Sequence, residues 1–239
     1  MKTILLVAAD RDEFAGLRRR LGRLVRLQWP IGYSASTEWR GKRLLLAANG
    51  PGLKLAGEAV DVAGRHASIG ALVSTGYCGG LNPALGPGEI FVASRLTAAG
   101  EAETYPVQLP VASRSYCSGT LISVDHVVST VREKSRLRAH GADAVDMEAV
   151  AVARRAARWG VPFFCVRVIT DTAGESFVCD LNGARGQDGR FRRWKIVLSA
   201  CHRPREGFPE LVRLRRRTRR GALALGEFLA GCEFPLDGA

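Results

Sequence analysis

The sequence predicts a three-layer α/β/α fold around a central mixed, largely parallel β-sheet. Three observations lead to this prediction: apolar runs of strand length recur along the chain, segments of helical periodicity alternate with them, and glycines or acidic residues follow where the runs end. Buried strands that alternate with helices are typical of a sheet covered on both faces. Ligands of such sheets collect at the carboxyl ends of the strands, so we expect one cleft there.

The apolar runs and the helical stripes give the element order. Strands are predicted over residues 3–9, 44–48, 70–75, 89–94, 121–124 and 162–170. Helices are predicted from about residue 12, with Phe14, Leu17, Leu21 and Leu24 on one face, and over residues 53–64, 147–159 and 209–229. The polar stretches 96–120 and 174–207 are predicted to be mostly loop.

Composition excludes several classes of protein. With 239 residues, 46% of them hydrophobic, the chain is not intrinsically disordered. No window reaches the roughly 20 apolar residues of a membrane span. The apolar start, residues 1–9, is interpreted as a strand because charged residues follow at once. The six cysteines are scattered and form no C-x-x-C pair, which predicts reduced thiols, no metal site and a cytoplasmic location.

No linker divides the chain, so we expect one domain over residues 1–239. Within it, residues 177–207 form an atypical loop region before the C-terminal helix at 209–229.

The net charge of +12 is concentrated in residues 17–26 and 203–220. The simpler interpretation is two solvated helix faces, and the alternative is an anionic partner such as nucleic acid or a membrane surface. The arginine-rich part of the second run, residues 213–220, contains no interleaved aromatic residues that could stack on bases, and no known nucleic-acid-binding signature is present. We therefore expect no nucleic-acid partner.

Three carboxylates have both a structural and a catalytic interpretation. Asp171, directly after the strand 162–170, is either a turn residue or an acid that protonates a leaving group. Glu148 is either a partner of the helix dipole or a ligand for two sugar hydroxyls, and Met147 is either core or an apolar surface for the sugar. Glu13 forms a capping box with Asp10 or orients a water molecule.

A glycine-rich turn follows the strand 70–75 and brings backbone amides close to a ligand. Its residues are Gly76, Tyr77, Cys78, Gly79 and Gly80. The turn matches neither G-x-G-x-x-G nor the P-loop pattern, so it predicts no nucleotide cofactor by itself.

Five segments, residues 4–14, 48–59, 71–94, 119–128 and 143–174, resemble the nucleoside phosphorylase/nucleosidase superfamily. They are most similar to its methylthioadenosine/S-adenosylhomocysteine nucleosidase and futalosine hydrolase branch. The most specific feature is the Met147-Glu148 pair followed by a helix, a V-P-F strand and an ending at Asp171.

The resemblance implies cleavage of an N-ribosidic bond through a transition state with oxocarbenium character. It implies that Asp171 protonates the leaving base, that Met147 and Glu148 hold the ribose, and that Glu13 positions or activates water. It further implies that Gly76, Tyr77, Cys78 and Gly79 line the base and nucleophile region, that no cofactor or metal is needed, and that the chain is a homodimer whose partner loop completes the site.

Two departures from the family pattern bear on the nucleophile and the substrate. Phosphate-using members carry Arg-x-Gly-Ser where this chain has Ser74-Thr75-Gly76-Tyr77, which favours water. Val127 occupies the position where methylthioadenosine enzymes place an aromatic residue over the purine.

We therefore expect hydrolysis of the N-ribosidic bond of a purine nucleoside or 5′-modified nucleoside, with release of the base. The alternatives are a phosphorylase with phosphate as co-substrate, a hopanoid-associated adenosyl nucleosidase and a non-catalytic nucleic-acid binder. The V-D-M-E motif at residues 145–148 resembles the hopanoid-associated members of the superfamily.

Overall fold

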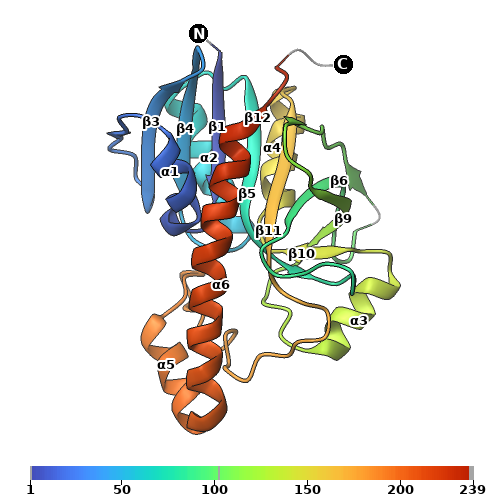
Figure 1. Ribbon diagram of the computed structural model, residues 1–239. Helices are drawn as coiled ribbons and strands as arrows, with labels where there is room; N and C mark the ends of the chain where they lie inside the picture. The colour runs from blue at the N-terminus through green and yellow to red at the C-terminus, as the bar shows by residue number, and fades with distance from the viewer. Residues whose placement is uncertain (1, 102, 237–239) are drawn as a thin grey trace.

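A computed structural model describes residues 2–101 and 103–236, with the side chain of Arg193 excepted (Figure 1). Its main sheet runs in the order β10-β9-β6-β11-β5-β1-β4-β3-β2, and a short strand, β7, pairs with β6. The bounds are β1 Thr3–Ala8, β2 Val25–Arg26, β3 Tyr33–Trp39, β4 Lys42–Ala48, β5 Ala71–Gly80, β6 Ile90–Ala98, β7 Thr104–Tyr105, β9 Cys117–Ser123, β10 Ala144–Asp146 and β11 Phe163–Asp171. A separate pair joins β8 (Val111–Ala112) to β12 (Cys232–Glu233).

The centre of the sheet is parallel and its flanks are mixed. Strands β4, β1, β5 and β11 run parallel, with Leu6 opposite Val73 and Val73 opposite Phe164. Beyond β11 the direction reverses, because β6 pairs with it antiparallel, and β9 then runs parallel to β6. The predicted mixed α/β sheet is confirmed, and its parallel centre places the carboxyl ends of β1, β5 and β11 side by side.

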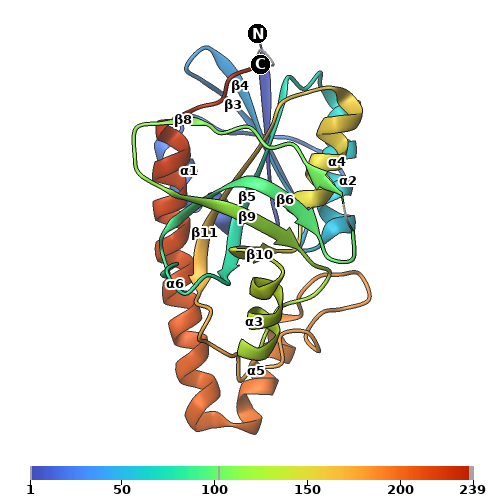
Figure 2. The same cartoon turned by 90° about the vertical axis from the view of Figure 1, so that its right-hand side faces the viewer.

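Helices cover both faces of this sheet, which Figure 2 shows most clearly. One face carries α2 (Leu53–His66) and α4 (Ala149–Trp159), and the other carries α1 (Ala15–Arg20) and α6 (Pro204–Gly231). The α1–α6 contact is so close that a Cβ at Gly226 would lie 1.9 Å from the backbone nitrogen of Leu17. Only glycine fits there, so this contact fixes α6 against the start of the chain.

Several predicted boundaries were wrong. Met147 and Glu148 precede α4 instead of belonging to it, since the Asp146 carboxylate accepts a hydrogen bond from the Ala149 N–H and begins the helix there. The residues predicted as a glycine-rich turn continue β5 to Gly80, because β11 and β10 supply pairing partners for them.

The stretches predicted to be loops hold regular structure. Residues 96–120 contain β7, β8 and the start of β9, and residues 174–207 contain α5 (Arg193–His202). The last helix begins at Pro204 instead of residue 209. The first helical segment consists of a 3-10 turn (Arg11–Phe14) followed by α1, and it ends at Arg20. Two elements, β3 and α3 (Val131–Ala139), were not predicted. Among the described residues, none of the helices is long and apolar enough to cross a membrane.

Candidate active site

A cavity of about 300 Å³ opens at the carboxyl ends of β1, β5 and β11. Four carboxylates line it: Glu13 after β1, Asp146 at the end of β10, Glu148 before α4 and Asp171 at the end of β11. The remaining predicted site residues that line the same cavity are Met147, Tyr77, Cys78, Gly79 and Val127. Gly76 does not line it directly but lies against Glu13.

Glu13 is held between β1 and β5. Its Oε2 accepts a hydrogen bond from the Ala9 N–H at 3.0 Å, while Asp10 caps the 3-10 turn through the Asp12 N–H at 2.9 Å. A Cβ on Gly76, whose φ is +138°, would lie 2.5 Å from the same oxygen, so glycine is required at that position. Burial, and then the nearby Glu148, raise the pKa of Glu13 to about 8.

Glu148 is anchored by two backbone amides. Its Oε1 accepts from the Gly52 N–H at 2.9 Å and its Oε2 from the Met147 N–H at 3.3 Å. Burial and the charge of Asp146 raise the pKa of Glu148 to about 7. A carboxylate fixed in this way retains free lone pairs toward the cavity, where it can accept hydrogen bonds from vicinal hydroxyls.

Asp171 is paired with a fully buried lysine that the sequence did not single out. Its Oδ2 accepts from Lys134 Nζ at 2.5 Å, and Nζ also donates to the carbonyl of Thr172 at 2.7 Å. Its Oδ1 accepts from the Thr170 hydroxyl at 2.9 Å. Burial raises the pKa of Asp171, and the ammonium of Lys134 opposes that rise.

A buried arginine lies behind the three acids. Arg167, in the middle of β11, donates through Nε to Asp146 at 3.1 Å and through Nη2 to Asp146 and to Ser74, the latter at 2.7 Å. Its Nη1 has no hydrogen-bond partner among the described residues. Its charge lowers the pKa of both Glu13 and Glu148.

Arg167 was missed by the sequence analysis although a signal exists. It is one charged residue inside the apolar run of residues 162–170, and a charge in a fully buried strand must be paired. Its partner Asp146 is further held by Ser123, whose hydroxyl donates at 2.5 Å. This network pairs the charge of Arg167 with that of Asp146 and holds the guanidinium in place beside the site.

The opposite wall of the cavity is apolar. It consists of Phe177, Leu181, Phe191, Ile196 and Leu214, all from the chain after β11. Two bonds between the Asn182 side chain and the backbone of Val127, at 2.8 and 2.9 Å, join this wall to the loop before α3. Tyr77 donates its hydroxyl to the carbonyl of Thr218 at 3.1 Å. The cavity therefore combines this apolar wall with the carboxylates that line the rest of it.

Comparison with known proteins relates this arrangement to one superfamily. Residues 3–190 match the model of the phosphorylase superfamily. Among solved structures, the fold is similar to that of 5′-methylthioadenosine/S-adenosylhomocysteine nucleosidase from Neisseria meningitidis in complex with methylthio-immucillin-A, with a TM-score of 0.73 and 19% identity over 97% of this chain and 98% of that one. A search of curated proteins found no match.

Two further solved structures are similar at comparable levels. S-adenosylhomocysteine nucleosidase from Streptococcus pyogenes has a TM-score of 0.69 and 20% identity, with 96% of each chain covered. A futalosine hydrolase mutant of Helicobacter pylori has a TM-score of 0.68 and 16% identity over 97% of this chain and 98% of that one. At these identities the similarity establishes the fold.

Proposed function

This chain belongs to the phosphorylase superfamily, and on that premise we propose that it hydrolyses the N-ribosidic bond of a purine nucleoside or 5′-modified nucleoside and releases the base. The observation on which this depends is that Glu13, Glu148 and Asp171 line one cavity, each with a pKa raised by burial. Groups perturbed in this way and gathered in a cleft are typical of catalytic sites.

In the proposed reaction, Glu148 accepts hydrogen bonds from the ribose hydroxyls and Met147 packs against the sugar. The C1′–N bond breaks, its electron pair passes to the base, and Asp171 gives the base a proton. The carboxylates stabilise the positive charge that develops on the sugar. Water then adds to C1′ and transfers its proton to ionised Glu13, so the products are the free base and a ribose that keeps its 5′ group.

Water is favoured over phosphate as the nucleophile by the charges around the cavity. The carboxyl groups that line the cavity include Glu13 and Glu148, and the Arg167 guanidinium is already bonded to Asp146. With Glu13 ionised, as the proposed hydrolysis requires, a phosphate dianion would meet repulsion there that a water molecule does not. Ser74 is fully buried and accepts from Arg167, so it is not exposed to a ligand.

The apolar wall favours a substrate with an apolar 5′ substituent. A nucleoside that carries only a 5′ hydroxyl would leave Phe177, Leu181 and Phe191 without an apolar partner. This observation keeps the hopanoid-associated adenosyl nucleosidase as a second candidate within the same reaction class. The proposed chemistry uses side chains and water alone, with no cofactor.

The experiment is a panel of inosine, adenosine, methylthioadenosine, futalosine and an adenosine with a long 5′-alkyl group. Released base is measured by chromatography with and without phosphate, and Asp171→Asn serves as the inactive control. We expect phosphate-independent release, fastest for the apolar 5′ groups. Release that requires phosphate would establish a phosphorylase instead, and no release from any nucleoside would favour a non-catalytic binder.

A further inference from the structure

The structure contains a helical hairpin that projects beyond the sheet at the end opposite the two termini (Figures 1 and 2). We define the hairpin as residues 192–220, that is α5 and the first part of α6. Its two helices touch near the turn, where a Cβ on Gly207 would lie 2.7 Å from the Cα of Ala200. The buried Glu210 carboxylate accepts from the Val178 and Cys179 N–H groups at 2.9 and 2.8 Å, which joins the hairpin to the loop after β11.

The hairpin exposes large apolar side chains to solvent. On α5, Trp194, Val197 and Leu198 are 63%, 48% and 53% exposed, and their spacing places them on one face of the helix. On α6, Phe208 and Val212 are exposed one turn apart. Half of the ten exposed large apolar residues in the described part of the chain thus lie between residues 194 and 212. Such a concentration marks an interaction surface.

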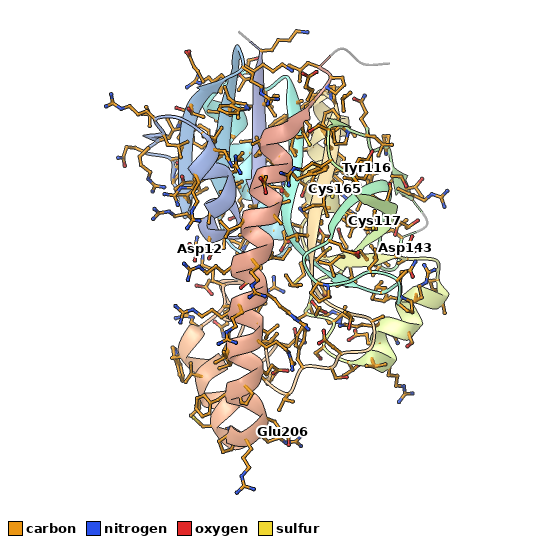
Figure 3. All side chains as sticks on the ribbon, in the orientation of Figure 1. Asp12, Tyr116, Cys117, Asp143, Cys165 and Glu206 are labelled. Atoms are coloured by element: carbon orange, nitrogen blue, oxygen red, sulfur yellow. The ribbon has the colours of Figure 1, made fainter. Side chains whose placement is uncertain are left out.

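The same hairpin is strongly basic. Residues 192–220 contain eleven Lys and Arg against two Glu, a net charge of +9 out of the +12 of the whole chain. Of the two acids, Glu210 is buried and bonded to backbone amides. Arg216 and Arg220 line one surface groove with Phe208 and Val212, so basic and apolar groups are adjacent. Figure 3 shows Glu206 at the outer end of the hairpin.

These two properties together select one class of partner. A second copy of the chain would bring +9 against +9, and such like charges repel. Single-stranded nucleic acid would match the charge and could stack on Trp194 and Phe208. It would leave the exposed aliphatic side chains of Val197, Leu198 and Val212 without an apolar partner. An anionic lipid surface matches both the positive charge and the exposed apolar side chains of the hairpin, because its phosphates attract arginine while Trp and aliphatic side chains enter the interface.

We propose that the α5–α6 hairpin docks the protein peripherally on an anionic membrane surface. The apolar face of α5 and the residues Phe208 and Val212 enter the interfacial region, and the arginines of α6 contact lipid phosphates. The same helices supply Ile196 and Leu214 to the wall of the cavity, so docking brings that wall close to the lipid. This inference concerns the surface alone and stands whether or not the proposed reaction is correct.

The test is flotation of the full chain with vesicles of phosphatidylcholine alone or mixed with phosphatidylglycerol. Two double variants, Trp194→Gln with Leu198→Gln and Arg216→Gln with Arg220→Gln, separate the apolar from the basic contribution. Val25→Gln with Arg95→Gln is the matched control, because both residues are exposed and lie in strands outside the hairpin. Thermal unfolding confirms that each variant is folded.

We expect binding to the anionic vesicles only, weakened by salt, with an affinity about tenfold lower in each hairpin variant and unchanged in the control. Equal binding to both kinds of vesicle, no binding, or full binding by the hairpin variants would overturn the proposal. Tighter binding to a single-stranded oligonucleotide than to anionic vesicles would assign the surface to nucleic acid. A lipid-free oligomer that the Trp194→Gln, Leu198→Gln variant dissociates would assign it to a second copy of the chain.

Discussion

Glu13→Gln should stabilise the protein at high pH and not at low pH. In the folded chain the pKa of Glu13 is about 8, against an ordinary value of 4.5, so folding favours the protonated acid. The protein therefore keeps its full stability at pH values below the ordinary pKa of 4.5, and it loses stability as the pH rises toward 8. Because one pKa unit corresponds to about 1.4 kcal/mol, the full penalty for ionisation is about 5 kcal/mol, of which about 3 kcal/mol develops between about pH 5 and pH 8.

Glutamine is neutral at every pH and can still accept the hydrogen bond from the Ala9 N–H, so the variant lacks this penalty. We expect its Tm to lie close to that of the parent near pH 5 and to exceed it by about 6–12 °C near pH 8. The assay is thermal unfolding followed by circular dichroism across this range. Glu38→Gln, at an exposed position, is the control and should parallel the parent. Parallel curves for Glu13→Gln and the parent would refute the reasoning.

The remaining predictions concern the other acids and Arg167. Asp171→Asn removes the proton that the base requires, so kcat should fall by about two to four orders of magnitude, as measured by base release, while thermal unfolding shows an intact fold. In the Asp171→Asn variant, where the acid no longer titrates, the residual kcat/KM should rise about tenfold per pH unit up to about pH 8, because Glu13 acts as a base only when ionised and its pKa is about 8; a flat profile for this variant would exclude Glu13 as the base. Arg167→Met leaves the Asp146 carboxylate buried without its counter-charge, so urea unfolding should report a loss of about 3–5 kcal/mol, part of which Asp146→Asn restores in the double variant.

The parts of the fold that the sequence predicted depend on local patterns. The apolar runs at residues 3–9, 44–48 and 162–170 mark strands of the sheet because a strand buried on both faces needs apolar side chains at every position. The expectation that acids after separate strands share one cleft followed from parallel strands ending at one edge. It needed no knowledge of the loops.

The boundaries failed where tertiary contacts outweigh local preference. The glycines after residue 75 signal a turn, yet they continue β5 because two neighbouring strands pair with them. The helical pattern begins at Met147, but the Asp146 side chain moves the start of α4 to Ala149, and this keeps Glu148 free to face the cavity.

By itself, the sequence determined the centre of the sheet, its core and the meeting of Glu13 with Asp171, since these follow from hydrophobic periodicity and from the geometry of parallel strands. The family resemblance added Glu148 to them. Only the tertiary structure decided which groups surround those acids. Lys134 meets Asp171, and Arg167 meets Asp146, across separate elements. No periodicity along the chain encodes these pairings, because they arise from burial, which requires each charge to find a partner wherever the fold places one.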